Sequence, residues 1–246
     1  MTESDFSGRV ALVTGGSGGI GAELSVRLAA AGAAVAVHYA ANRGVAEDVV
    51  AAVEATGGRA AALAADLRHA DAPELLVRAA EAELGPVAVL AANAGLAQPA
   101  TYDEVDATAF DETLVVNLRA PYLLARRVLP GMRERRFGRI LFTSSVAALT
   151  GGIVGPHYAS SKAGLHGLTH FLAPRVAPDG VTVNAIAPAL IEQTGMLPGD
   201  PAELAQHVPV GRLGRPSEVA DLALAVLRNG YVTNQVISID GGMHPG

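Results

Sequence analysis

The chain has 246 residues, of which 50% are hydrophobic and 17% charged, a composition that predicts one compact domain spanning residues 1–246 and excludes a disordered or fibrous chain. A formal net charge of -6 without a large basic cluster excludes a nucleic-acid-binding protein, and the absence of cysteine excludes disulfides, thiolate catalysis and cysteine metal sites. Because no apolar run reaches the roughly 18 residues of a membrane span and no signal segment opens the chain, we expect a cytoplasmic protein with no membrane partner and no metal.

Short apolar runs alternate with longer amphipathic stretches along the chain, and seven of these runs are predicted to be strands. Their continuous apolar character is typical of parallel strands that are buried on both faces. Strands interleaved with helices form β-α-β units with right-handed crossovers. The sequence therefore predicts the α/β class, with a doubly wound parallel sheet of about seven strands and helices on both faces. The predicted strands are residues 10–13, 34–38, 60–64, 87–91, 139–143, 181–185 and 236–239.

The stretch between the first strand and the first helix, from Thr14 to Gly21, is rich in glycine. Backbone without side chains lets a pyrophosphate approach the amides at a helix N-terminus, where the helix dipole also favours negative charge. In that arrangement Gly15 makes the tight turn, Gly19 admits the phosphates and Gly21 lets the helix pack on the strand. An ordinary glycine-rich turn is the alternative, but the flanking strand and helix favour a Rossmann-type dinucleotide-binding fold.

A later helix is predicted from about Pro156, with apolar residues at helical spacing up to Leu172. Pro174 falls where this pattern would continue. A proline inside a helix removes a backbone donor and crowds the preceding turn, at a cost of roughly 3 kcal/mol. We therefore expect this helix to kink or to end near Ala173.

Three side chains along this part of the sequence can supply and orient a proton. Lys162 follows Tyr158 by four residues, so both lie on one helix face and the ammonium can lower the tyrosine pKa from its ordinary value of about 10. Ser145 follows the fifth predicted strand, at the sheet edge where open parallel sheets bind ligands. The alternative is an amphipathic helix with a packed tyrosine and a surface lysine.

The spacing Gly15-x-x-x-Gly19-x-Gly21 resembles the glycine turn of the short-chain dehydrogenase/reductase family, and the resemblance extends from Arg9 to Gly242. The segment from Pro209 to Pro216 is similar to that of the 3-oxoacyl-acyl-carrier-protein reductases within this family. The other motifs that carry the resemblance are Asp66-Leu67, Ala92 to Gly95, Asn117, Ser144-Ser145, Tyr158 to Lys162, Asn184 to Pro188 and Asp240 to Gly242.

The resemblance implies a reversible hydride transfer between a nicotinamide and a small-molecule ketone or secondary alcohol, with a 3-oxoacyl thioester among the candidates. It implies that Tyr158 exchanges the proton, Ser145 orients the substrate oxygen and Lys162 binds the ribose and tunes the tyrosine. Asn117 would hold a water that links the lysine to solvent, although a buried amide can instead cap a local bend. The alternatives are an NAD(H)-dependent alcohol, sugar or steroid dehydrogenase of the same family and a non-catalytic dinucleotide-binding module.

NADP(H) is favoured over NAD(H), because no acidic residue stands at the end of the second strand to bind a ribose hydroxyl and repel a phosphate. Asn42 and Arg43 could meet the 2′-phosphate instead, and NAD(H) remains an alternative. Matching the family's motifs to this chain gives the expected cofactor-binding residues Gly15, Ser17, Gly18, Gly19, Ile20, Gly21, Tyr39, Asn42, Arg43, Asp66, Leu67, Asn93, Ala94, Gly95, Tyr158, Lys162, Pro188 and Ile191.

The substrate side of the site is less defined by the sequence. Residues 190–208 are expected to form a mobile, irregular lid that contains Pro198. The resemblance also implies a homotetramer, in which the helices around residues 106–132 and 156–173 pair across one two-fold axis and the C-terminal segment pairs across another. Arg135 and Arg136 could dock an acidic carrier protein, but Asp179 opposes it, so a small thioester is the expected substrate. Candidate pocket residues are Leu96, Leu149, Ile153, Val154, His157 and Met196.

Overall fold

A parallel β-sheet forms the centre of the protein, and the computed structural model describes residues 6–195, 197 and 199–244. Within these residues the sheet has seven strands, all parallel, in the order β3-β2-β1-β4-β5-β6-β7. This confirms the predicted fold class. The strands are β1 (Val10–Thr14), β2 (Ala34–Tyr39), β3 (Ala60–Ala64), β4 (Val87–Ala92), β5 (Gly138–Thr143), β6 (Val181–Pro188) and β7 (Val236–Ile239).

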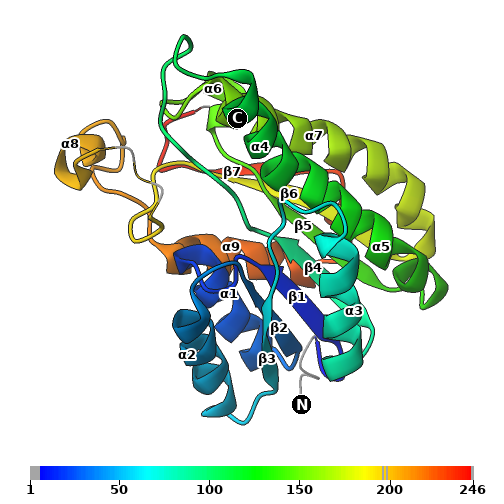
Figure 1. Ribbon diagram of the computed structural model, residues 1–246. Coiled ribbons are helices and arrows are strands. Elements are labelled where there is room, and N and C mark those ends of the chain that lie inside the picture. Colours follow the sequence, from blue (N-terminus) through cyan, green and yellow to red (C-terminus); the bar gives the residue numbers. More distant parts are fainter. Residues whose placement is uncertain (1–5, 196, 198, 245–246) are drawn as a thin grey trace.

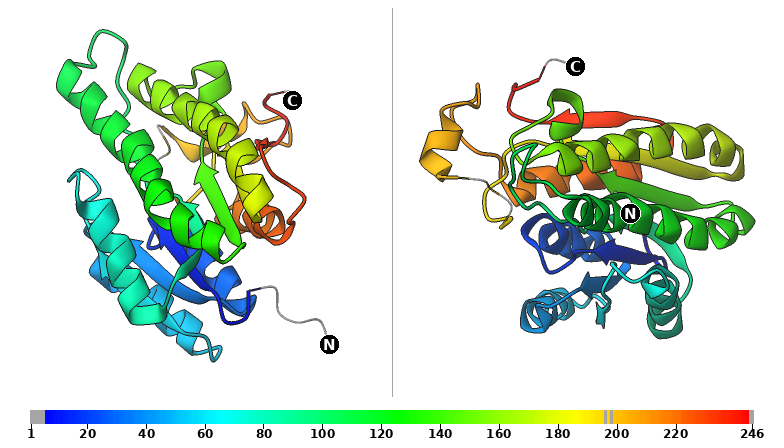
Figure 2. Two further views of the ribbon diagram at one scale, coloured as in Figure 1. Left: turned by 90° about the vertical axis from the view of Figure 1, so that its right-hand side faces the viewer. Right: turned by 45° about the horizontal axis from the view of Figure 1, so that its top comes forward.

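Helices cover both faces of the sheet (Figures 1 and 2). One face carries α1 (Gly19–Ala30), α2 (Arg43–Glu54) and α9 (Pro216–Arg228), while the other carries α3 (Ala72–Leu84), α5 (Ala120–Glu134) and α7 (Pro156–Val176). Among the described residues, no helix combines the length and the apolar character needed to cross a bilayer. The shorter helices are α4 (Ala107–Leu114), α6 (Ala147–Thr150) and α8 (Pro201–Ala205). Helix α8 projects from the body of the molecule in Figure 1.

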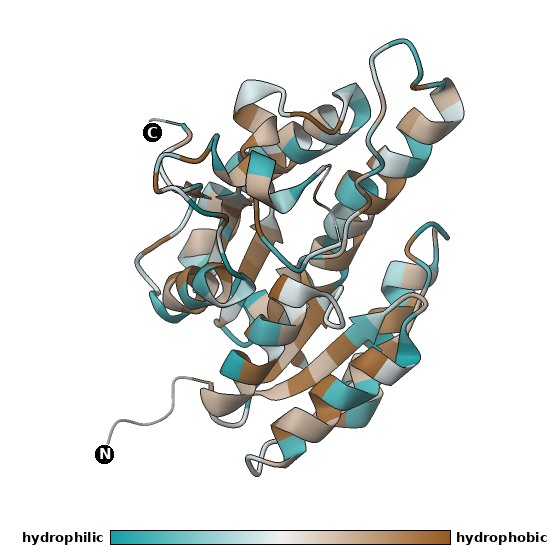
Figure 3. Ribbon diagram, turned by 90° about the vertical axis from the view of Figure 1, so that its left-hand side faces the viewer, coloured by the Kyte–Doolittle hydropathy of each residue, from teal (hydrophilic) through white to brown (hydrophobic). Residues whose placement is uncertain are grey.

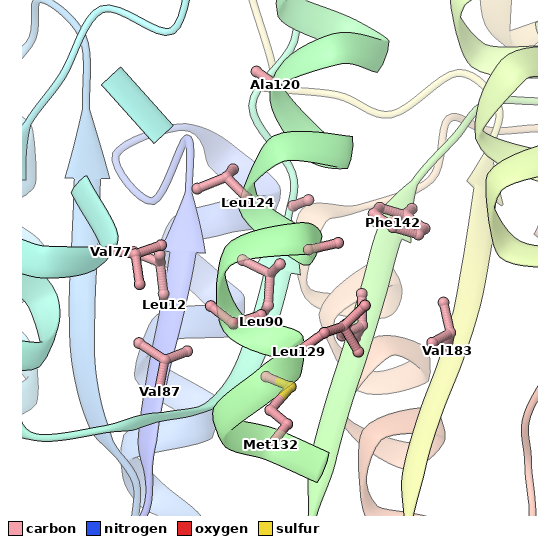
Figure 4. Close-up of a cluster of buried hydrophobic side chains, with 14 of the residues drawn as sticks. Leu12, Val77, Val87, Leu90, Ala120, Leu124, Leu129, Met132, Phe142 and Val183 are labelled. Atoms are coloured by element: carbon pink, nitrogen blue, oxygen red, sulfur yellow. The ribbon is translucent and has the colours of Figure 1, made fainter. Parts of the chain in front are cut away.

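The central strands carry most of the apolar core. Strands β1, β4 and β6 are buried along their whole length, whereas the edge strands β3 and β7 are only partly covered. Figure 4 shows Leu90 and Phe142 of the sheet and Leu129 and Met132 of α5 within one buried cluster. The strands are coloured mainly as hydrophobic in Figure 3. Because the sheet is covered on both faces, each central strand has the continuous apolar sequence that predicted it.

The order of the strands places a ligand crevice at one edge of the sheet. The chain winds outward from β1 through β2 and β3 on one side and through β4 to β7 on the other. At such a reversal the connections leave the strands in opposite directions, and a crevice opens at their carboxyl ends. The glycine turn after β1 therefore lies at the mouth of this crevice.

The helix beginning at Pro156 was expected to kink or to end near Ala173, and the early end is wrong. Helix α7 continues through Pro174 to Val176, and a 3-10 helix (Ala177–Asp179) follows it. Because Pro174 lies in the last turn, its missing amide removes only one helical hydrogen bond. The amide of Ala177 still donates to the carbonyl of Ala173, which closes the helix end.

Candidate active site

A cavity of about 790 Å³ opens at the carboxyl ends of the strands. It runs from the glycine turn after β1, past the ends of β2 and β3, to the start of α7. Most of the residues predicted to bind the cofactor or to act in catalysis lie on its wall. They are Gly15, Ser17, Gly18, Gly19, Ile20, Asn42, Asp66, Leu67, Asn93, Ala94, Gly95, Ser145, Tyr158, Lys162, Pro188 and Ile191.

The glycine turn is packed closely on both sides. Gly15 has φ +62°, and a Cβ added there would lie 3.0 Å from the Cα of Ala94. A Cβ at Gly21 would collide with the carbonyl oxygen of Gly15, so this glycine lets α1 pack against the turn. The hydroxyl of Thr14 accepts hydrogen bonds from the amides of Asn93 (3.0 Å) and Ala94 (3.1 Å), which ties the turn to the end of β4.

The turn leaves backbone amides without an acceptor at the place where the sequence predicts a pyrophosphate site. The amides of Gly19 and Ile20, at the start of α1, have no backbone acceptor in the described part of the chain. Free amides at a helix N-terminus are the groups that bind a pyrophosphate, and the helix dipole adds a favourable field. The residues present therefore fit a dinucleotide cofactor.

Three of the predicted cofactor residues do not line the cavity: Gly21, Tyr39 and Arg43. Gly21 lies beneath the turn, as described above, and Tyr39 packs against the apolar cluster between the sheet and α1 and α2. The Arg43 guanidinium pairs with Glu47 at 2.7 Å, one helical turn along α2, and is 74% exposed. The end of β2 instead contributes Ala40, Ala41 and Asn42 to the wall, with the last as the polar side chain.

At the other end of the cofactor region, Asp66 is held by a neighbour that sequence reasoning missed. The Nε of Arg68 donates to Oδ1 of Asp66 at 3.0 Å and its Nη2 donates to Oδ2 at 2.7 Å. These contacts with Arg68 lower the pKa of Asp66 to about 2. Arg68 also bonds Glu112 of α4 at 3.2 Å and itself lines the cavity. Its position directly after Asp66-Leu67 was the signal for it in the sequence.

The predicted catalytic side chains meet deep in the cavity. Ser145 lies after the end of β5, while Tyr158 and Lys162 lie in the first turns of α7, and their exposed fractions are 9%, 9% and 4%. The ammonium of Lys162 donates to the carbonyl of Thr143 at 2.8 Å, so the end of β5 fixes the lysine. The hydroxyl of Ser144 donates to the backbone carbonyl of Lys162 at 3.0 Å, so Ser144 ties the end of β5 to α7.

Burial governs the acid-base properties of this cluster. It raises the pKa of Tyr158, and the hydrogen bond with Ser145 lowers it in part. We expected the ammonium of Lys162 to lower the pKa of Tyr158, but it does not contribute to that pKa. The ammonium lies 5.6 Å from the ring centroid and donates to the carbonyl of Thr143 instead. Burial also lowers the pKa of Lys162 to about 8, so the side chain still carries its charge at neutral pH.

Asn117 lies in a π-helix (Val115–Arg119) between α4 and α5 and is fully buried. Its Oδ1 accepts from the amide of Leu96 at 2.7 Å, and its Nδ2 donates to the carbonyl of Leu96 at 2.9 Å and to the hydroxyl of Ser161 at 3.0 Å. The Asn117 side chain therefore pins the loop after β4, a contact between distant segments and not the cap of a local bend. A Cβ on Gly95 would lie 3.3 Å from both Asn117 Oδ1 and the ammonium of Lys162. The Oδ1 of Asn117 and the Nζ of Lys162 are therefore no farther apart than twice 3.3 Å.

Comparison with known proteins places this geometry in a family. The sequence model of the short chain dehydrogenase family matches residues 9–204. The chain belongs to this family. A 3-oxoacyl-[acyl-carrier-protein] reductase of Synechocystis is 34% identical, covering 97% of this chain and 98% of its own. An acetoacetyl-CoA reductase of Shinella zoogloeoides is 38% identical, covering 95% and 98%.

Among solved structures, a blue fluorescent protein from a metagenomic library, crystallised in complex with NADPH, aligns with a TM-score of 0.91. It is 34% identical and covers 98% of this chain and 100% of its own. As a short-chain dehydrogenase/reductase, the protein is an oxidoreductase that acts on CH-OH and C=O groups with a nicotinamide cofactor.

The substrate side of this short-chain dehydrogenase/reductase is mostly apolar. Three of the six candidate pocket residues line the cavity: Leu96, Ile153 and Val154. Two others do not, since Leu149 is 44% exposed outside it and His157 is buried away from it. Met196, like Pro198 of the expected lid, lies outside the described residues. Sequence reasoning missed Thr150, in the short helix α6, and Met243, near the end of the chain. Leu204 and His207, which also line the cavity, belong to the segment expected to form the lid.

The basic residues considered for carrier docking lie at the opposite edge of the sheet. Arg135 donates to the carbonyl of Val87, the first residue of β4, at 2.7 Å. Asp179, just before β6, pairs with Arg133 at 2.6 Å and with Arg136 at 3.9 Å. Within one chain these side chains therefore stabilise the amino-terminal ends of the strands and do not form a rim of the cavity.

Proposed function

We propose that this short-chain dehydrogenase/reductase is an NADP(H)-dependent enzyme that interconverts a compact ketone, such as a short 3-oxoacyl thioester, and the corresponding secondary alcohol. The observation that carries the proposal is the placement of Ser145, Tyr158 and Lys162 on the wall of a cavity that begins at a phosphate-binding turn. The cofactor supplies or accepts the hydride. The side chains of this chain hold the substrate and move the proton.

The proposed proton donor for reduction is the hydroxyl of Tyr158. Burial keeps this phenol protonated at neutral pH, which suits a group that must donate as negative charge develops on the substrate oxygen. Ser145, whose side chain shares the cavity wall, bonds the same oxygen and fixes its direction. In the oxidative direction the tyrosine takes the proton back, with its anion stabilised by the Ser145 hydrogen bond.

Lys162 provides a positive charge near this phenol at neutral pH. Its ammonium donates one hydrogen bond, to Thr143, so its remaining N–H groups are available for the cofactor ribose. A water between Lys162 and Asn117 would connect the lysine to the loop at Leu96, and the limited separation of the two side chains supports this relay. Asn117 acts in it by holding the loop that borders the water.

Selectivity for NADP(H) follows from the absence of a carboxylate at the end of β2, where Ala40, Ala41 and Asn42 line the cavity. Ser17 and Asn42 offer neutral donors to a 2′-phosphate. The Arg43–Glu47 pair is exposed, and exposed pairs contribute about 0.2–1 kcal/mol, so the arginine can leave it to meet the phosphate. NAD(H) is the competing cofactor.

A small thioester is the proposed substrate, because the pocket is apolar and the described rim of a single chain lacks the basic cluster that would steer an acidic carrier. Residues 190–208 form the proposed lid, and Leu190, Thr194, Leu197, Leu204 and His207 of this segment already line the cavity.

The experiment is a reductase assay with NADPH and with NADH on three forms of one acyl group: acetoacetyl N-acetylcysteamine, acetoacetyl-CoA and acetoacetyl-acyl carrier protein. We expect turnover of the small thioesters with NADPH and no large advantage for the carrier-bound form. A salt-sensitive preference for the carrier protein would reject the substrate class. Absence of any ketone reduction or alcohol oxidation across a broad panel would reject the function.

A homotetramer is the proposed assembly, with the helical faces of α5 and α7 forming one interface. Tyr122 of α5 and Phe171 of α7 are large aromatic side chains that are 44% and 57% exposed. Light scattering tests this directly, because four chains of 25.0 kDa give about 100 kDa. A particle of one chain mass at micromolar concentration would contradict the proposal.

A further inference from the structure

A buried histidine lies directly beneath the glycine turn. His38 is the fifth residue of β2 and is 2% exposed. Its ring Nδ1 accepts a hydrogen bond from the amide of Gly15 at 3.0 Å, and its backbone carbonyl accepts from the amide of Gly16 at 2.8 Å. One residue therefore holds two successive amides of the turn. On the other side of the ring, Nε2 lies 3.0 Å from the carbonyl of Ala65, at the end of β3.

These partners fix the protonation of the imidazole. A backbone amide can only donate, so Nδ1 of His38 must be unprotonated to accept from Gly15. The neutral ring then carries its proton on Nε2, where it can donate to Ala65. The neutral histidine satisfies both neighbours, and it bridges the ends of β1, β2 and β3.

A doubly protonated ring cannot keep this arrangement. With a proton on Nδ1, the N–H of His38 would face the N–H of Gly15, and both groups would lose their partner in a buried site. The turn has little room to adjust, because a Cβ on Gly16 would lie 2.9 Å from a methyl group of Val37 and one on Gly15 would lie 3.0 Å from Ala94. Protonation must therefore break the ring contact or displace the turn.

We propose that His38 is a positioning residue for the cofactor, whose neutral imidazole holds Gly15 so that the turn presents its free amides to the pyrophosphate. Dinucleotide binding then requires this histidine to be neutral and weakens in acid with the uptake of one proton. The inference rests on the proposed function, because it takes the turn as the pyrophosphate site.

The other titratable groups around β2 do not account for the proposed dependence of dinucleotide binding on one proton. Strands β1 and β3, which flank β2, carry no titratable side chain. Burial lowers the pKa of His38 and the Ala65 carbonyl raises it in part, so the ring is neutral at pH 7. The titratable side chains of the surrounding helices and loop are Glu23 and Arg27 (α1), Arg43, Glu47, Asp48 and Glu54 (α2), Asp66, Arg68, His69 and Asp71 (after β3), and Glu74, Arg78, Glu81 and Glu83 (α3). None of these contributes to the pKa of His38.

The test is calorimetric titration of the full-length protein with NADP⁺ at pH 7.5, 6.5, 5.5 and 5.0. Wild type is compared with His38→Asn, whose amide oxygen can accept from Gly15 without titrating, and with His38→Leu, which has no acceptor. The 2′-phosphate of NADP⁺ itself gains a proton in this range, but it does so equally for all three proteins. A parallel series with NAD⁺, which lacks that phosphate, is a second control, and circular dichroism checks the fold at each pH.

We expect the wild-type affinity to fall at least about tenfold more than that of His38→Asn between pH 7.5 and 5.0, and His38→Leu to bind at least about tenfold more weakly than wild type at pH 7.5. If His38→Leu does not fold, the comparison of wild type with His38→Asn decides. Parallel pH profiles for these two proteins, or wild-type affinity in a folded His38→Leu, would overturn the inference. If wild type binds neither dinucleotide at pH 7.5, the proposed function is wrong and the inference falls with it.

Discussion

Replacing Lys162 by methionine is expected to stabilise the cofactor-free protein at neutral pH while it removes activity. The lysine is 4% exposed, and burial lowers its pKa from 10.5 to about 8. At about 1.36 kcal/mol for each pH unit, this difference corresponds to about 3 kcal/mol of unfolding free energy that the charged side chain costs below pH 8. Methionine has a similar length and no charge, but it gives up the hydrogen bond to Thr143, which is worth about 1.5–3 kcal/mol for a charged donor. The net gain at pH 7 is therefore about 1 kcal/mol.

The direction in which the unfolding free energy changes with pH distinguishes the cost of burying the Lys162 charge from a general packing effect. Because the folded pKa of Lys162 lies below the unfolded one, the unfolded chain binds more protons between about pH 8 and 10.5, and wild-type stability rises with pH across that window. The cost of the charge shrinks from about 3 kcal/mol at pH 7 to about 1 kcal/mol at pH 9.5. Lys162→Met has no such dependence, so its advantage should vanish by pH 9.5.

Urea denaturation followed by circular dichroism, at one protein concentration and at pH 7.0 and 9.5, measures both differences. Lys162 is the only lysine in the sequence, so protein labelled with ¹³C-lysine gives a single side-chain signal whose titration reports the pKa directly. We expect a midpoint near pH 8. A midpoint at pH 10 or above, or a variant that is less stable than wild type at pH 7.0, would refute the reasoning.

The remaining predictions concern catalysis and the cofactor. Tyr158→Phe should lower turnover by at least about a hundredfold and leave NADP⁺ affinity nearly unchanged, and near-normal turnover in a chemistry-limited assay would contradict its role. Gly21→Ala should weaken dinucleotide binding at least about tenfold, because the methyl group collides with the Gly15 carbonyl. Gly44→Ala in α2 is the matched control, since a Cβ there meets nothing within 4 Å. This variant should keep its dinucleotide affinity and gain about 0.5–1 kcal/mol of stability. Equal dinucleotide affinities for the two variants would show that the methyl group at Gly21 does not disturb the turn. Finally, kcat/KM should be at least about tenfold higher with NADPH than with NADH, and equal values would overturn the cofactor preference.

Local patterns in the sequence were sufficient for the fold and for part of the site. The seven apolar runs predicted the seven strands, because parallel strands covered by helices on both faces are mostly apolar along their length. The glycine turn was predictable because its backbone leaves no room for a side chain at Gly15 or Gly21. Tyr158 and Lys162 were predictable as neighbours because four residues make about one turn of a helix.

Contacts between distant segments were decided only by the tertiary structure. The contact of Lys162 with Thr143 and that of Asn117 with Leu96 join segments 19 and 21 residues apart.

His38 shows most clearly the difference between what the local sequence predicts and what the tertiary structure decides. The sequence shows a histidine inside an apolar strand but not its hydrogen-bond partners. Those partners, Gly15 and Ala65, are brought to either side of the ring because β2 lies between β1 and β3 in the sheet. Hydrogen bonds act over about 3 Å in space regardless of separation along the chain, so the order of the strands, and not the local sequence, determines what this histidine does.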